Sequence, residues 1–332
     1  MRRVIAYRFG RDDLLRTHFA ISPLFELVAS VRVLRDPGAH SVHLPWVREA
    51  RSRLAGFDYA LLDALDPANT PYAPDFVAPP PRTPLPDVHE ELERVRATPP
   101  DRVRLELEWT FAGRAIPAIA RPLYDDPVQE LPGLVELMAA YWERAIAPSW
   151  ERVRAVLEAD IRQRARALAG RGAIELFAGL DPEVRWHDGA LIVDRAYEAE
   201  VELAGRGLQL VPAAFGWPRV GAMFDPPWQP ALIYPPRGVG DLWAPRPEDP
   251  GALGDLLGRR RASILVALAA EASTTELAGR LAASPAGVSE HLGVLRRAGL
   301  VRARREGRAV LYSRTAAGDV LTAPSPSPGS PS

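Results

Sequence analysis

Arginine is concentrated near the C-terminal end of this chain, where guanidinium groups could bind phosphates. Segment 259–314 holds eleven arginines and four glutamates, a net charge of +7, so the rest of the chain carries −8 of the total of −1. A basic segment attached to an acidic body is typical of proteins that bind nucleic acid or another polyanion. The chain contains no lysine, and abundant arginine by itself is also explained by a solvated basic face. The positions of the arginines within the predicted elements must therefore distinguish nucleic-acid binding from a solvated basic surface.

The sequence offers few side chains for catalysis or metal binding. It contains no cysteine, which excludes disulfides, thiolate nucleophiles and thiolate metal sites. His40 and His43 form a close pair, but no Asp or Glu lies between Gly38 and Val47, so a third metal ligand would need to come from elsewhere in the chain. No serine elbow, phosphate loop or dinucleotide-binding glycine pattern is present. We therefore expect no enzyme, no cofactor and no bound metal.

Two short helices joined by a tight turn are predicted within the basic segment. Ser273, with Glu276 three residues later, begins the first helix as a capping box. Ser284 followed by Pro285 begins the second, which extends over about 285–298. This second helix carries Val288, Leu292 and Leu295 at four- and three-residue spacing, which places them on one face. Because its other face is polar, the pair predicts a helix-turn-helix.

A basic β-hairpin is predicted directly after the second helix. Gly299 ends the helix, and alternating residues then flank the turn Glu306-Gly307-Arg308. A hairpin over about 301–314 in this position corresponds to the wing of a winged helix.

These elements predict binding of double-stranded DNA. The second helix fits the major groove, with its N-terminal side chains nearest the base edges. Helix N-terminal amides can hold phosphates, and wing arginines can reach phosphates or the minor groove. The candidate DNA-binding residues are Thr274, Thr275, Ser284, Ala286, Ser289, Glu290, His291, Arg296, Arg297, Arg304, Arg305 and Arg308. His291 could instead be a surface histidine, and Arg296 and Arg297 could serve as general electrostatic contacts.

The C-terminal segment resembles the winged helix of ArsR-type bacterial regulators over about 252–320. The residues that carry this resemblance are Thr-Glu-Leu-Ala at 275–278, Ser-Pro-Ala-Gly-Val-Ser-Glu-His-Leu at 284–292, the wing residues 304–308 and Tyr312. Metal-sensing members of that family carry a cysteine pair on the first helix, or Asp and His ligands after the wing. Here Ala278 and its neighbours lack a thiol and Asp319 lacks a histidine partner, so metal sensing is not expected.

The N-terminal part predicts a mostly helical body closed by a small antiparallel sheet. Helices are expected at about 22–34, 45–54, 59–65, 88–97 and 128–169. One hairpin is expected at Asp188-Gly189, and a second joins 201–203 to 208–211. Eight tryptophans fill the core or line a pocket for an apolar or aromatic effector, and both interpretations stay open. Trp46 and the stretch 224–230 resemble the uncharacterised domain that accompanies this winged helix in regulators from high-GC bacteria.

We thus expect an α+β protein, mostly α, with a body at 1–245, a winged helix-turn-helix at 252–320 and a disordered tail at 323–332. It lacks an apolar run long enough for a membrane span and an N-terminal signal, so we expect it in the cytoplasm. We predict a homodimeric transcription regulator, with repression inferred from the family resemblance. The alternative is a protein-interaction module that uses the winged helix to bind a partner. A module of that kind does not need arginines on the wing, so the wing arginines favour DNA binding.

Overall fold

The chain divides into two compact units, residues 1–244 and 245–332. The computed structural model describes residues 3–67, 72–195, 198–243, 251–269, 271–281, 283–306 and 309–322. Segment 244–250 and the tail expected at 323–332 fall outside these residues. Each unit has a hydrophobic core of its own.

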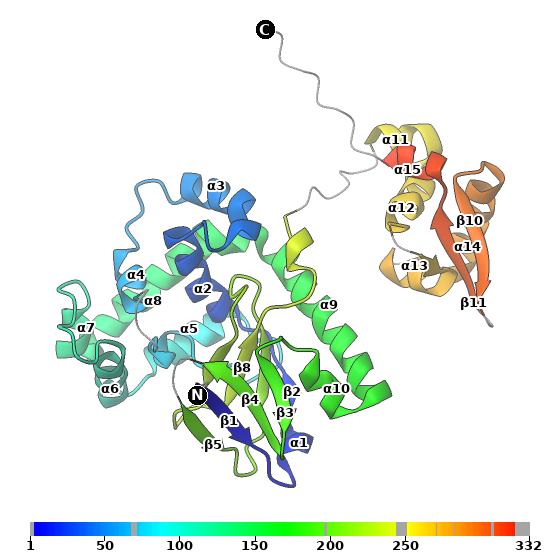
Figure 1. The fold of residues 1–332 in the computed structure, drawn as a ribbon. Helices are drawn as coiled ribbons and strands as arrows, with labels where there is room; N and C mark the ends of the chain where they lie inside the picture. The colour runs from blue at the N-terminus through cyan, green and yellow to red at the C-terminus, as the bar shows by residue number, and fades with distance from the viewer. Residues whose placement is uncertain are drawn as a thin grey trace. The chain divides into compact units, whose positions relative to one another are not determined.

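Helices make up most of the N-terminal unit (Figure 1). Helices α2 (Pro23–Arg35), α5 (Val88–Arg96) and α8 (Pro127–Tyr141) pack on one another and contribute to the largest core. The predicted start of α2 is confirmed, because the Ser22 side chain accepts the N–H of Phe25. The other helices are α1 (Asp13–Arg16), α3 (Leu44–Arg53), α4 (Ala60–Leu65), α6 (Pro100–Thr110), α7 (Arg121–Asp125), α9 (Ala147–Arg171) and α10 (Ala173–Ala178). A π-helical turn, Trp142–Ile146, joins α8 to α9.

Two four-stranded sheets complete this unit, so the expected α+β fold is confirmed. The first has the order β3 (Val184–His187), β4 (Ala190–Arg195), β1 (Arg3–Arg8), β5 (Ala199–Glu202). The second has the order β2 (His18–Phe19), β6 (Gln209–Pro212), β8 (Ala231–Tyr234), β7 (Gly221–Met223). The predicted β3–β4 hairpin is confirmed, with φ of 46° at Asp188 and 71° at Gly189 as a type I′ turn requires.

The second predicted hairpin is wrong, and the sheets are mixed instead of antiparallel. Strand β5 pairs in parallel with β1, whereas β6 lies between β2 and β8 in the other sheet and is parallel to both. The intervening glycines turn the chain toward α1 instead of back on itself. A Cβ at Gly207 would lie 2.6 Å from the carbonyl carbon of Arg16, and the Gly207 N–H donates to the buried Asp13 carboxylate at 2.9 Å.

The loop that follows β6 is fastened to the helices by three buried side chains. The two carboxylate oxygens of Glu26 accept the N–H groups of Ala214 (2.6 Å) and Phe215 (2.8 Å). His43 Nε2 donates to the Ala214 carbonyl at 3.0 Å, because its Nδ1 accepts the indole N–H of Trp243 at 2.9 Å. Burial lowers the pKa of His43 to about 4, so this ring is neutral. His40 Nδ1 lies 2.7 Å from the Trp217 carbonyl, so both histidines of the pair serve this loop.

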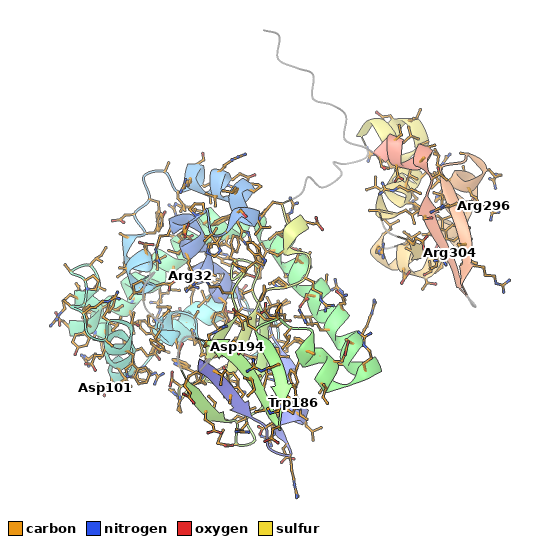
Figure 2. All side chains as sticks on the ribbon, viewed as in Figure 1. Arg32, Asp101, Trp186, Asp194, Arg296 and Arg304 are labelled. Atoms are coloured by element: carbon orange, nitrogen blue, oxygen red, sulfur yellow. The ribbon has the colours of Figure 1, made fainter. Side chains whose placement is uncertain are left out.

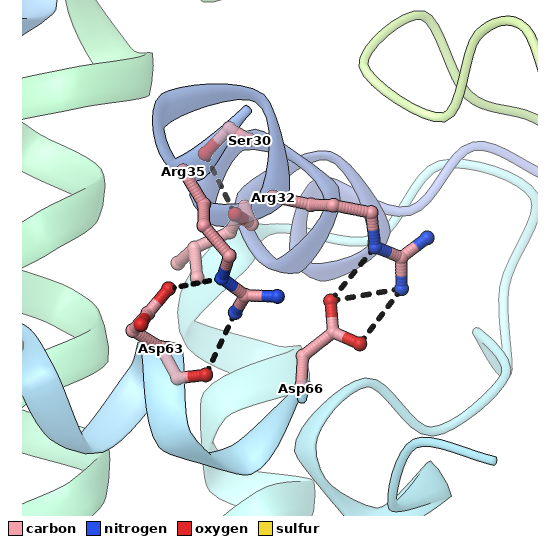
Figure 3. A network of polar contacts seen from close by, with 6 residues as sticks. Ser30, Arg32, Arg35, Asp63 and Asp66 are labelled. Atoms are coloured by element: carbon pink, nitrogen blue, oxygen red, sulfur yellow. Dashed lines mark hydrogen bonds and ion pairs between the residues drawn. The ribbon is translucent and has the colours of Figure 1, made fainter. Parts of the chain in front are cut away.

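Arginines of α2 clamp the neighbouring helix α4 (Figure 3). Arg32 makes two hydrogen bonds of 2.9 Å to the two carboxylate oxygens of Asp66, which follows the last residue of α4. Arg35 bonds both the carboxylate (2.6 Å) and the backbone carbonyl (2.7 Å) of Asp63. Two-point contacts of this kind fix direction as well as distance, so α4 is held in one orientation on α2.

Seven of the eight tryptophans lie in or against a hydrophobic core, which favours packing as their main role. Trp109 differs, with 38% of its surface exposed. The packed residues are Trp46, Trp142, Trp150, Trp186, Trp217, Trp228 and Trp243.

A second buried glutamate, Glu91, joins α5 to the start of α2. Its Oε2 accepts the hydroxyl of Ser22 (3.0 Å) and the N–H of Leu24 (2.9 Å), while its Oε1 is buried without a hydrogen-bond partner. Burial raises the pKa of this carboxyl from 4.5 to about 7, despite the two donors that lower it. A carboxyl with one oxygen unsatisfied is better accommodated in its protonated form.

We predict that Glu91→Gln becomes progressively more stable than the wild type as pH rises from 5 to 8. The folded-state pKa of Glu91 lies above the unfolded one, so the stability linked to its proton is full below about 4.5 and lost as pH passes through about 7. The relative gain reaches at most about 3 kcal/mol. Urea unfolding followed by tryptophan fluorescence measures it, since all eight tryptophans lie in this unit. Glu90→Gln at the exposed neighbouring position is the control. If the free energies of unfolding of the wild type and Glu91→Gln changed in parallel with pH, the prediction would be contradicted.

Candidate nucleic-acid interface

The C-terminal unit packs its helices and a three-stranded sheet around eleven buried apolar residues. Its helices are α11 (Gly251–Leu257), α12 (Arg259–Ala267), α13 (Thr274–Arg280), α14 (Pro285–Arg297) and α15 (Ala316–Thr322). Its strands are β9 (Ala272–Ser273), β10 (Val301–Glu306) and β11 (Ala309–Arg314), in the order β10-β11-β9. Helices α12, α13 and α14 contact one another, and α14 also contacts β10.

Helix α13 begins with the predicted capping box. The Ser273 hydroxyl accepts the N–H of Glu276 at 3.3 Å, and Glu276 Oε2 accepts the N–H of Ser273 at 2.9 Å. Leu277 and Ala278 are buried, and Arg280 donates to the Ala267 carbonyl of α12 at 3.3 Å. The helix is therefore fixed at both ends.

Helix α14 presents one apolar and one polar face, as predicted. Ser284 Oγ accepts the N–H of Gly287 at 3.2 Å, and Pro285 occupies the first helical position. Val288, Leu292 and Leu295 are at most 2% exposed. The inner face is thus committed to the core, and the remaining side chains of the helix must point elsewhere.

The C-terminal end of α14 is closed by a Schellman motif at Gly299. The Leu300 N–H donates to the Leu295 carbonyl and the Gly299 N–H to the Arg296 carbonyl, both at 3.0 Å. Gly299 has φ of 72°, which glycine adopts without strain. Buried Leu300 and Val301 then lead directly into β10, so the wing begins at a fixed distance from the helix.

The wing is a regular antiparallel pair in which Ala303 faces Tyr312 and Arg305 faces Val310. Side chains alternate between the faces of a strand, so Arg304 and Arg305 point to opposite sides of the ribbon. Arg305 shares the side of Val301, which is buried in the core, whereas Arg304 lies on the other side. Neighbouring positions in the sequence therefore place two cations on two different surfaces.

Arg304 is already engaged in an ion pair with Glu271, at 3.0 Å between Nη2 and Oε2. The hydrogen bond from Arg304, together with its positive charge, lowers the pKa of the Glu271 carboxyl. Sequence reasoning missed this partner, because the contact reaches from β10 to the residue before β9. Arg302 on the same side of the ribbon donates to the Ser313 hydroxyl at 3.0 Å.

Most of the candidate DNA-binding residues are solvent-exposed, and Figure 2 labels two of them, Arg296 and Arg304. Thr274 and His291 are half-buried, and Arg308 lies outside the described residues. The exposed candidates are Thr275, Ser284, Ala286, Ser289, Glu290, Arg296, Arg297, Arg304 and Arg305. All the described candidates lie on α13, α14, the cap of α14 or β10.

Two family matches agree with this division of the chain. Residues 259–304 match a family described as a helix-turn-helix domain. The C-terminal unit is a helix-turn-helix domain with a wing. Residues 101–239 match a family of unknown function (DUF5937). No curated protein and no solved structure matches the chain. Among the described residues, none of the helices is both long and apolar enough to cross a membrane.

We predict that Ser284→Ala loosens the start of the exposed helix without unfolding the unit. Loss of an N-cap hydroxyl costs about 1 kcal/mol, which corresponds to amide exchange roughly fivefold faster in the first turns of α14. Hydrogen exchange with mass spectrometry of peptides that cover 285–297 measures this change. Ser289→Ala is the matched control, because Ser289 is exposed on the same helix and does not cap it. Equal exchange rates in the two variants would show that the cap has no role.

Proposed function

We propose that this protein is a sequence-specific, DNA-binding transcription regulator. The observation that carries the proposal is the helix-turn-helix with a wing, whose second helix buries its apolar face and exposes Glu290, Arg296 and Arg297. In this proposal α14 enters the major groove, and β10 and β11 lie against phosphates or the minor groove. The net charge of +7 over 259–314 supports attraction to the DNA backbone.

We further propose that the protein acts as a cytoplasmic homodimer and as a repressor that occupies promoter DNA. A single short recognition helix contacts too few base pairs to specify a site, so two helices on a two-fold operator are expected. The half-sites would then be separated by about one helical turn or a multiple of it. The sign of regulation is proposed from the resemblance of residues 284–301 to ArsR-type regulators.

The N-terminal unit offers a place for a small-molecule effector. A hollow of about 320 Å³ lies between the α9–α10 region and the segments that follow β6 and β8, with Trp217 and Pro236 among its walls. Arg164, one of the lining residues, is buried and paired with Asp160 at 2.7 Å. Arg237 is exposed, and no ion pair joins its guanidinium to another described residue. An aromatic wall beside an accessible cation suits a planar aromatic anion.

We predict that Arg305→Ala flattens the salt dependence of binding to the protein's own promoter DNA. Loss of one phosphate contact reduces the slope of log affinity against log salt by about one. Fluorescence anisotropy between low and physiological salt measures the slope. Arg162→Ala is the control, because Arg162 is an exposed arginine of α9 that pairs with Glu158. An unchanged slope would exclude Arg305 from the interface, and absence of DNA binding even at low salt would favour the protein-interaction alternative.

We predict that the N-terminal unit binds indole-3-carboxylate more tightly than the neutral indole-3-carboxamide. The carboxylate can pair with Arg237 while its ring lies against Trp217, so Arg237→Gln should weaken binding about tenfold. Isothermal titration with the full chain measures both ligands. Arg219→Gln, at another exposed arginine near Trp217, should leave affinity unchanged. Equal affinities for acid and amide would contradict an anion site in this hollow.

A further inference from the structure

The side of α14 that faces away from the core is a narrow ridge of four residues. Successive residues of an α-helix are rotated by about 100°, so the line opposite Val288, Leu292 and Leu295 is set by their positions. That line carries Ala286, Glu290, Gly293 and Arg297. Glu290 is therefore the first side chain along the ridge, counted from the N-terminal end, that is long enough to reach a base edge.

Among the residues that the structure describes, Glu290 has no partner that explains its charge. It is exposed, and no hydrogen bond or ion pair joins it to another described residue. The four positions one turn away carry no cation that could form a helical ion pair with it: they are Ala286, Gly287, Gly293 and Val294. This carboxylate therefore lies opposite the buried face of α14 in a basic unit, without a cationic partner among the described residues.

The small residues on either side of Glu290 leave its carboxylate prominent and allow the helix backbone to approach a groove floor. At Gly293 a Cβ would be 3.5 Å from Nη1 of Arg297, which places that guanidinium along the same ridge. From its N-terminal to its C-terminal end, the ridge thus presents the Glu290 carboxylate as a hydrogen-bond acceptor and then the Arg297 guanidinium as a donor. The arginine adds positive charge to the same ridge, which reduces the repulsion between the carboxylate and DNA phosphates.

A carboxylate in the major groove needs a base amino group as its donor. Two bases offer one there, cytosine at N4 and adenine at N6. The amino group of adenine lies beside the acceptor N7, which repels the second carboxylate oxygen, whereas cytosine has no acceptor at that edge. The chemistry of Glu290 therefore favours a C·G pair over the other three pairs.

We propose that Glu290 is a specificity-determining residue that selects cytosine at one position of each half-site by accepting a hydrogen bond from N4. This inference rests on the proposed function, and it adds the base that the recognition helix reads. Arg297 on the same ridge and Arg296 beside it supply attraction, while Glu290 penalises sites that lack a suitably placed amino group.

Glu290→Gln should change the selected base from cytosine to adenine. A glutamine amide presents one acceptor and one donor, which match N6 and N7 of adenine. The full chain and its Glu290→Gln variant are each used to select duplexes from a randomised library, and anisotropy then compares duplexes that differ at one base pair. We expect the wild type to prefer cytosine at that position by about tenfold or more, and the variant to prefer adenine.

Two further variants separate base reading from charge. Glu290→Ala removes the acceptor and should lose the preference at this position alone, with the rest of the selected sequence unchanged. Asp255→Asn on α11 changes the net charge of the unit equally at an exposed position and should alter no base preference.

The outcomes distinguish this inference from the proposed function. A selected sequence that stays the same in wild type, Glu290→Gln and Glu290→Ala would overturn the assignment of Glu290 and leave the regulator proposal standing. If the wild type enriches no sequence at all, both proposals fall. A change of base at one position per half-site, confined to the Glu290 variants, supports the assignment.

Discussion

Burial of one face of α14 against the C-terminal core is the constraint on which the whole interface depends. Leu292 at the centre of that face is completely buried, so the helix cannot rotate without exposing it. Ser284 and Gly299 fix where the helix begins and ends, which prevents it from shifting along its axis. With rotation and position both fixed, each outward side chain has a defined direction, and the start of the wing follows from the end of the helix.

The N-terminal unit depends on a different interaction, the satisfaction of backbone N–H groups by buried carboxylates. Glu26 holds the loop after β6, Glu91 holds the start of α2, and Asp13 holds the crossing at Gly207. Each carboxylate bridges segments that are far apart in sequence. Because burial also raises the pKa of Glu26 and Glu91 to about 7, these two glutamates titrate near neutral pH.

The features that were predictable from sequence are those decided within a few residues. The caps of α2, α13 and α14 and the turn at Asp188 depend on neighbours at most four positions away. Helix α6 had no clear signal, because its inner face includes the buried polar residues Glu106 and Thr110 and its apolar periodicity is interrupted.

Features that depend on contacts between residues far apart in the sequence could not be predicted from local sequence patterns. The glycines at 205 and 207 suggest a hairpin, yet the contact that redirects the chain is with Arg16, almost the whole unit earlier in the sequence. The Arg304–Glu271 pair likewise depends on strand order. Within the candidate interface, most of the described side chains that sequence identified are exposed, but sequence did not identify the carboxylate with which Arg304 is paired.

The opposite directions of Arg304 and Arg305 have a consequence for how this hairpin can change over evolutionary time. Because the side-chain period of a strand is two, a gain or loss of one residue after Gly299 would exchange the two arginines between faces. A change of two residues would restore them. Insertions or deletions of an even number of residues before the two arginines therefore keep each of them on its own face of the hairpin. An odd number moves each arginine to the opposite face.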